Sequence, residues 1–75
     1  MKLKDYRKKA KELGGKLKVH GNSLGRFVTV VNADGIEMPS ISSKEFREAN
    51  QAYYDLVNTM KLDLELREEG YITSF

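Results

Sequence analysis

The sequence predicts a small α+β protein, a two-layer sandwich with the element order α-β-β-β-α. Its three strands are expected to form an antiparallel sheet with the helices packed on one face. Two segments, residues 1–13 and 42–69, carry apolar residues at helical spacing. Between them, residues 16–41 hold alternating or β-branched runs separated by turn sequences. The 75 residues form one expected domain, 1–75, near the lower size limit for a self-sufficient core.

The first helix is predicted from a single apolar stripe. Leu3, Tyr6, Ala10 and Leu13 recur at helical spacing, with Lys, Arg and Glu at most positions between them. The pair Gly14-Gly15 follows at once and is typical of a helix end, because glycine adopts the left-handed conformation without penalty. The helix is therefore expected to end at Leu13.

Three strands are expected after this helix. Residues 16–20 alternate between lysine or histidine and apolar side chains, and residues 26–32 are β-branched and aromatic. Residues 21–25 have turn chemistry, and Asn32–Gly35 is typical of a tight hairpin turn. A third strand is expected over residues 36–41, at a sheet edge because Pro39 cannot donate to a ladder.

The second helix is expected to begin at a capping box, with Ser42 as N-cap and Glu45 reaching back. After Met60 the pattern is ambiguous between helix and strand, and good helix formers favour a helix to about residue 69. The tail of residues 71–75 either folds back over the helix or adds a short strand. The expected core stripe of this helix contains Phe46, Ala49, Tyr53, Leu56, Val57, Met60 and Leu64.

An uninterrupted second helix has a consequence for two leucines. Leu62 and Leu66 would lie opposite the core stripe and form an exposed apolar pair, which predicts self-association through them. The expected core combines the stripes of both helices with the strands. It contains Leu3, Tyr6, Ala10, Leu13, Leu17, Val19, Val28, Val30, Phe46, Tyr53, Leu56, Val57 and Met60.

The charge is unevenly distributed along the chain. Residues 1–26 carry nine of the thirteen Lys and Arg residues against two acidic ones, whereas residues 43–75 carry seven acidic residues against four basic ones. One interpretation is that the two ends partly neutralise each other in the fold. The other is that the N-terminal segment presents a basic face to an anionic partner.

The candidate partner-binding residues lie mainly in this basic segment. Three lysines follow one another on the first helix as one ridge, and two lysines share a strand face with the single histidine. A tyrosine beside polar residues on the second helix is a typical contact anchor in protein interfaces. The full set is Lys4, Lys8, Lys11, Lys16, Lys18, His20, Arg26 and Tyr54.

No pattern in the sequence points to catalysis, a cofactor or a metal. One histidine and no cysteine exclude the usual zinc sites. No serine lies in a nucleophile-elbow context. The loop 21–26 lacks the Gly-Lys-Ser/Thr ending of a phosphate loop and leads into a strand. We therefore expect a protein that is not an enzyme.

The predicted element order resembles that of the double-stranded-RNA-binding domain. That family places a basic patch at the start of its second helix. Here Lys44 and Arg47 are offset by Glu45 and Glu48, so the resemblance does not extend to the binding residues. In size and layout the chain is also similar to small bacteriophage inhibitors, some anti-CRISPR proteins among them, which are compact α/β sandwiches without active sites.

The expected function is that of a non-enzymatic binding protein of the phage or mobile-element accessory type. It would dock on a macromolecular partner, a protein rather than a nucleic acid, and inhibit or modulate it. The alternative is a nucleic-acid-binding domain that uses the basic N-terminal helix and first strand. The charged N-terminus has no apolar region behind it, and no run approaches the roughly 18 apolar residues of a membrane span. A cytoplasmic location without a membrane partner is therefore expected.

Overall fold

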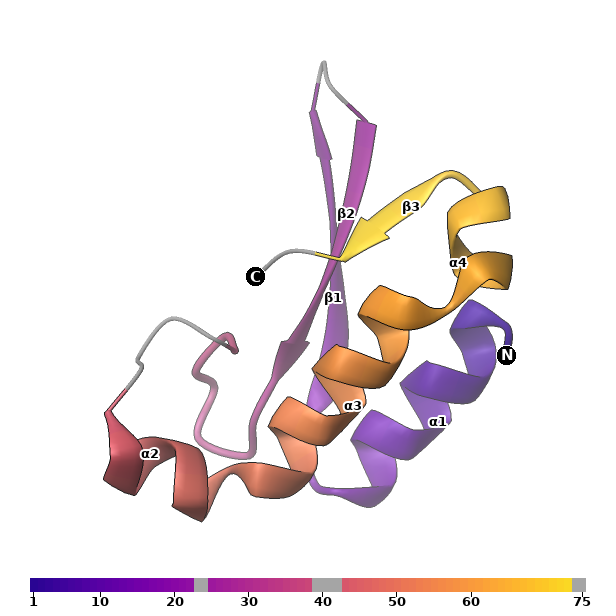
Figure 1. Cartoon of the computed structure of the whole chain (residues 1–75). Helices are drawn as coiled ribbons and strands as arrows, with labels where there is room; N and C mark the ends of the chain where they lie inside the picture. The colour runs from indigo at the N-terminus through magenta and orange to yellow at the C-terminus, as the bar shows by residue number, and fades with distance from the viewer. Residues whose placement is uncertain (23–24, 39–42, 74–75) are drawn as a thin grey trace.

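The computed structural model describes residues 1–22, 25–38 and 43–73 of the chain. In chain order the elements are α1 (Leu3–Glu12), β1 (Lys16–Asn22), β2 (Gly25–Val31), α2 (Lys44–Ala49), α3 (Gln51–Leu62), α4 (Leu64–Glu68) and β3 (Tyr71–Thr73). Helices α1, α3 and α4 pack against a small sheet, with α1 and α3 side by side, whereas α2 contacts α3 and stands apart from the strands (Figure 1).

The sheet is mixed, with the strand order β1-β2-β3. The hairpin of β1 and β2 is antiparallel, from Lys16 opposite Val31 onward, whereas β2 and β3 are parallel. The prediction of a small α+β fold is confirmed. The predictions of a wholly antiparallel sheet and of the order α-β-β-β-α are wrong, because the third strand comes from the C-terminal tail.

The predicted third strand at residues 36–41 is reduced to one bridge, between Val31 and Glu37. The turn before it forms as expected, because Asn32 Oδ1 accepts hydrogen bonds from the backbone N–H groups of Asp34 and Ile36 at 2.9 Å. A strand continued in that register would reach Phe27, whose place on this edge is taken by β3. Residues 39–41 lie outside the described residues.

The second helix begins one residue later than predicted and is broken near its start. Ser43 is the N-cap, and its Oγ accepts the N–H of Phe46 at 3.2 Å; Ser42 lies outside the described residues. Asn50 interrupts the helix with φ −119° and ψ 25°. Its amide donates to the Phe46 carbonyl at 2.8 Å and accepts from the Asn32 amide at 2.9 Å. Such side-chain bonds compete with helix continuation.

A second break at Asp63 separates α3 from α4. Asp63 is extended, with φ −81° and ψ 110°, and its Oδ1 accepts the N–H of Leu66 at 3.4 Å. The break changes the helical phase, so Leu66 is buried at 1% exposure while Leu62 is 75% exposed. Helical structure after Met60 is confirmed, but the expected exposed pair of leucines is wrong.

The core forms where the helices meet the inner face of the sheet, which carries Leu17, Val28 and Val30. Most predicted core residues are buried or packed against the core, but Val19 and Leu13 are 40% and 39% exposed. Val19 lies on the edge strand β1, opposite Val28, and Leu13 is the C-cap of α1. The buried cluster contains Tyr6, Ala10, Leu17, Val28, Val30, Met38, Tyr53, Leu56, Val57, Met60 and Leu66.

Part of the basic N-terminal segment is neutralised by the acidic C-terminal segment. The amino group of Met1 lies 3.0 Å from Asp63 Oδ2, and Lys2 Nζ lies 3.3 Å from Glu69 Oε1. Both pairs join the residues just before α1 to the residues that flank α4. Within the described residues, no helix is long and apolar enough to cross a membrane.

Candidate partner-binding face

The sheet face opposite the helices, here called the outer face, gathers three of the predicted site residues. Strand alternation and the core position of Leu17 place Lys16, Lys18 and His20 together on this face of β1. All three line an open hollow of about 440 Å³. Its other lining residues are Val31, Gly35 and Glu37.

Glu37 contacts two of these side chains within the hollow. Glu37 Oε1 lies 3.3 Å from Lys18 Nζ and 3.1 Å from His20 Nε2. The hydrogen bond from Lys18, followed by that from His20, lowers the pKa of Glu37 below its usual range. Lys16 makes no ion pair among the described residues, so the hollow has a cation available for a further anionic group.

Apolar side chains continue the outer face beyond the hollow. Phe27 is half-buried and lies opposite His20 on β1 and Ile72 on β3, so the three form a row across the sheet. Ile72 is 52% exposed. Thr29, opposite Lys18, is buried, and its Oγ1 has no hydrogen-bond partner in the described part of the chain. The basic strip of Lys16, Lys18 and His20 thus lies beside an apolar row formed by Phe27 and Ile72 on the same face.

The lysine ridge of the first helix lies elsewhere. Lys4, Lys8 and Lys11 are exposed on the side of α1 away from its buried residues Tyr6 and Ala10. Because α1 packs on the inner face of the sheet, these lysines lie on the opposite side of the molecule from Lys16 and Lys18. The structure therefore divides the predicted basic residues between two faces.

Arg26 and Tyr54 are also separate from the outer face. Arg26 shares the inner side of β2 with Val28, where its guanidinium lies 5.6 Å from the ring centroid of Tyr71 and donates to the Tyr71 hydroxyl at 3.3 Å. Tyr54 is half-buried against the core, with its ring edge-on to Phe46 at 6.3 Å. Tyr54 thus packs against the core, whereas Arg26 is exposed and contacts Tyr71.

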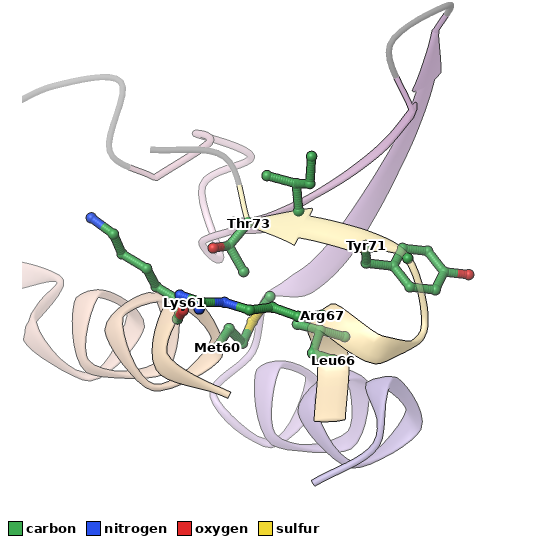
Figure 2. A pocket seen from close by; sticks show the side chains of 8 residues that line it. Met60, Lys61, Leu66, Arg67, Tyr71 and Thr73 are labelled. Atoms are coloured by element: carbon green, nitrogen blue, oxygen red, sulfur yellow. Dashed lines mark hydrogen bonds between the residues drawn. The ribbon is translucent and has the colours of Figure 1, made fainter. Parts of the chain in front are cut away.

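A second pocket, of about 480 Å³, lies between α3, α4 and β3. Met60 and Leu66 contribute buried apolar side chains to it, and Figure 2 shows the Arg67 side chain extending toward Lys61. Arg67 Nη2 donates to the Lys61 carbonyl at 3.1 Å. In the described ranges, no group of three or more acidic or histidine side chains is placed to hold a metal ion.

Comparison of this chain with protein-family models, with curated proteins and with solved structures found no match.

The predicted partner-binding residues did not include two residues of the outer face, Glu37 and Ile72. Glu37 follows the Asn32–Gly35 turn by two residues, and the predicted hairpin register would have placed it on the lysine side of the sheet. Ile72 had no such signal, because its position depends on the parallel pairing of β3 with β2. Hairpins are predictable from local turns, whereas this pairing depends on the path of three helices.

Proposed function

We propose that this chain is a non-enzymatic binding module that docks on an acidic protein through the outer face and thereby inhibits or modulates it. The observation that carries the proposal is the grouping of Lys16, Lys18 and His20 beside Phe27 and Ile72. Cations set beside an apolar row suit a protein surface, because apolar contact supplies affinity while charge complementarity supplies orientation and association rate.

Glu37 favours a protein partner over a nucleic acid on this face. Its carboxylate oxygen Oε1 lies 3.3 Å from Lys18 Nζ and 3.1 Å from His20 Nε2, among the polar side chains of β1. A phosphate backbone follows a run of cations and is repelled by a carboxylate among them. An acidic side chain of a protein can instead bind Lys16, which makes no ion pair among the described residues.

The second candidate is the nucleic-acid-binding domain, and one observation favours it. Phe27 lies outside the buried core and opposite His20, so it offers part of an aromatic face near two lysines. Single-stranded nucleic acids stack bases on such side chains. A contact of this kind would use the outer face alone, because the ridge of Lys4, Lys8 and Lys11 lies on the other side of the molecule.

The test compares two matched double variants. Lys16→Gln with Lys18→Gln removes two charges from the outer face, and Lys4→Gln with Lys8→Gln removes two from α1. Immobilised wild-type and variant chains are incubated with extract of the source cell, in parallel with and without nuclease treatment. A retained protein is then purified and its binding kinetics are measured. We expect the outer-face variant to slow association about tenfold or more, since steering depends on opposed charge.

The α1 variant serves as the control, since it has the same net charge as the outer-face variant. Its association rate should stay within about twofold of the wild type after allowance for long-range charge, which salt screens over roughly 8–10 Å. Equal losses in both variants would contradict docking through the outer face. Loss of all retained protein after nuclease treatment would favour the second candidate.

A further inference from the structure

The strand β1 forms one edge of the sheet. It is the first strand in the order β1-β2-β3, and within the described residues no strand pairs with its outer side. It is seven residues long and contains no proline. An edge of this length presents a row of backbone groups that another extended chain can bind.

The hydrogen-bond pattern identifies which groups point outward. The carbonyl of Val30 accepts the N–H of Met38 at 2.8 Å, so it points away from β1. Leu17 lies opposite Val30 and is therefore a non-hydrogen-bonded partner, with its own N–H and C=O directed to the free edge. By strand alternation the same holds for Val19 and Gly21.

The side chains beside this edge differ between the two faces of the sheet. The outer face carries Lys16, Lys18 and His20, whereas the inner face carries the buried Leu17 and the 40% exposed Val19. A strand added here would place alternate side chains next to the cations and next to Val19. The best match is a segment in which acidic and apolar residues alternate.

The same charges disfavour a second copy of this chain at the edge. Antiparallel pairing of β1 with another β1 places the outer faces of both copies on the same side of the joined sheet, so it brings their lysines close together. Like charges opposite each other across strands are destabilising, and opposite charges are stabilising. Lysines on an edge strand therefore oppose antiparallel self-pairing and favour an acidic strand.

We propose that an extended segment of the partner, with alternating acidic and apolar residues, adds to the free edge of β1. This inference rests on the proposed docking function and specifies how the partner is held. Backbone bonds to Leu17, Val19 and Gly21 supply the attachment, and the carboxylates of the segment face Lys16 and Lys18. Recognition by strand addition is a general mode of peptide binding.

The test uses the full chain labelled with ¹⁵N and a capped heptapeptide of alternating valine and glutamate, with valine at both ends. Amide hydrogen exchange is measured with and without the peptide. At ten times the dissociation constant, exchange of the outward amides of Leu17, Val19 and Gly21 should slow about tenfold. The amides of Lys18 and His20, already directed at β2, should change little.

Two variants sharpen the result. Val19→Pro removes one outward N–H without removing a bond to β2, and it should weaken peptide binding about tenfold. The double change Lys16→Glu with Lys18→Glu should reverse the peptide preference, so that the chain binds a heptapeptide of alternating valine and lysine more tightly than the one with glutamate. This second variant gives an answer even if Val19→Pro does not fold.

Other outcomes overturn the inference. Peptide binding without protection of the three outward amides would show docking on the face rather than pairing at the edge, and the proposed function would stand. Absence of binding at millimolar peptide would also reject strand addition. The proposed function is tested separately, and it fails if the outer-face and α1 double variants are equally impaired in partner association.

Discussion

Asp63 connects three parts of the chain through one carboxylate. It ends α3, accepts the N–H of Leu66 in α4, and receives a hydrogen bond from the Tyr6 hydroxyl and an ion pair from the Met1 amino group. The hydrogen bond from Tyr6, followed by that from Met1, lowers the pKa of Asp63 from 3.8 to about 2. The side chain is only 10% exposed.

We predict that Asp63 makes the protein sensitive to acid. Its pKa is lower in the folded than in the unfolded chain, so its contribution to stability is present above pH 3.8 and is lost as the pH falls toward 2. Asp63→Asn should lower stability at pH 7 and flatten the pH dependence of urea unfolding between these values. Glu37, whose pKa is also lowered, should account for a smaller pH dependence of stability that remains in Asp63→Asn.

Tyr6→Phe is the companion variant, because it removes only the hydroxyl that donates to Asp63. It should partly flatten the pH dependence of stability over the same pH range. An unchanged pH profile in Asp63→Asn would contradict this role of the carboxylate.

Two glycines should respond differently to the same substitution. A Cβ added at Gly15 would collide with the Val31 carbonyl and lie 2.8 Å from Tyr53 Cε1, whereas at Gly21 it would meet nothing within 4 Å. Gly15→Ala should therefore cost about 1–3 kcal/mol of unfolding free energy. Gly21→Ala should stay within about 0.5 kcal/mol of the wild type. Thermal and urea unfolding of both variants measure the difference, and equal effects would contradict the close approach at Gly15.

At the scale of elements, the sequence pattern predicted local structure well where the signal was local. The first helix and its glycine stop, the β1–β2 hairpin and the Asn32–Gly35 turn all follow from neighbouring residues. The break at Asp63 was not predicted, because it depends on a hydrogen bond from Tyr6, which lies 57 residues away in the chain. A residue that caps a helix through distant contacts gives no periodic signal.

The break at Asp63 predicts opposite behaviour for two leucines four residues apart. Leu66→Ala should cost about 2–4 kcal/mol, since the side chain is 1% exposed within the core. Leu62→Ala should change stability by less than about 0.5 kcal/mol, since that side chain is 75% exposed. Chemical denaturation measures both changes in unfolding free energy, provided that the variants and the wild type unfold with the same m-value. Similar costs for the two variants would indicate an uninterrupted helix and contradict the change of phase.

The third strand shows a second limit of local patterns. Residues 36–41 have a strand-like composition, yet Glu37 forms only one bridge, because β3 occupies the neighbouring edge of β2. Both segments are short, and α4 leads the later one, β3, to the edge of β2. Competition of this kind is decided by tertiary packing and not by strand propensity.

At the scale of the whole molecule, the fold divides one basic segment between two faces. Residues 1–26 are strongly basic, but the sheet and helices separate the α1 ridge from the outer face. The alternation of Lys16, Lys18 and His20 was readable from the sequence, and so was the helical spacing of Lys4, Lys8 and Lys11. Their separation was not, because it depends on which face of the sheet α1 covers.

The most direct test of protein docking through the outer face measures what this division does to nucleic-acid binding. Labelled single- and double-stranded oligonucleotides are titrated with the wild type and both lysine double variants at about 50 and 200 mM salt. We predict feeble binding at the lower salt, none measurable at the higher, and no selective loss in Lys16→Gln with Lys18→Gln. Tight binding with a log–log slope near −0.9 for each neutralised B-DNA phosphate, reduced by that double variant, would contradict the account.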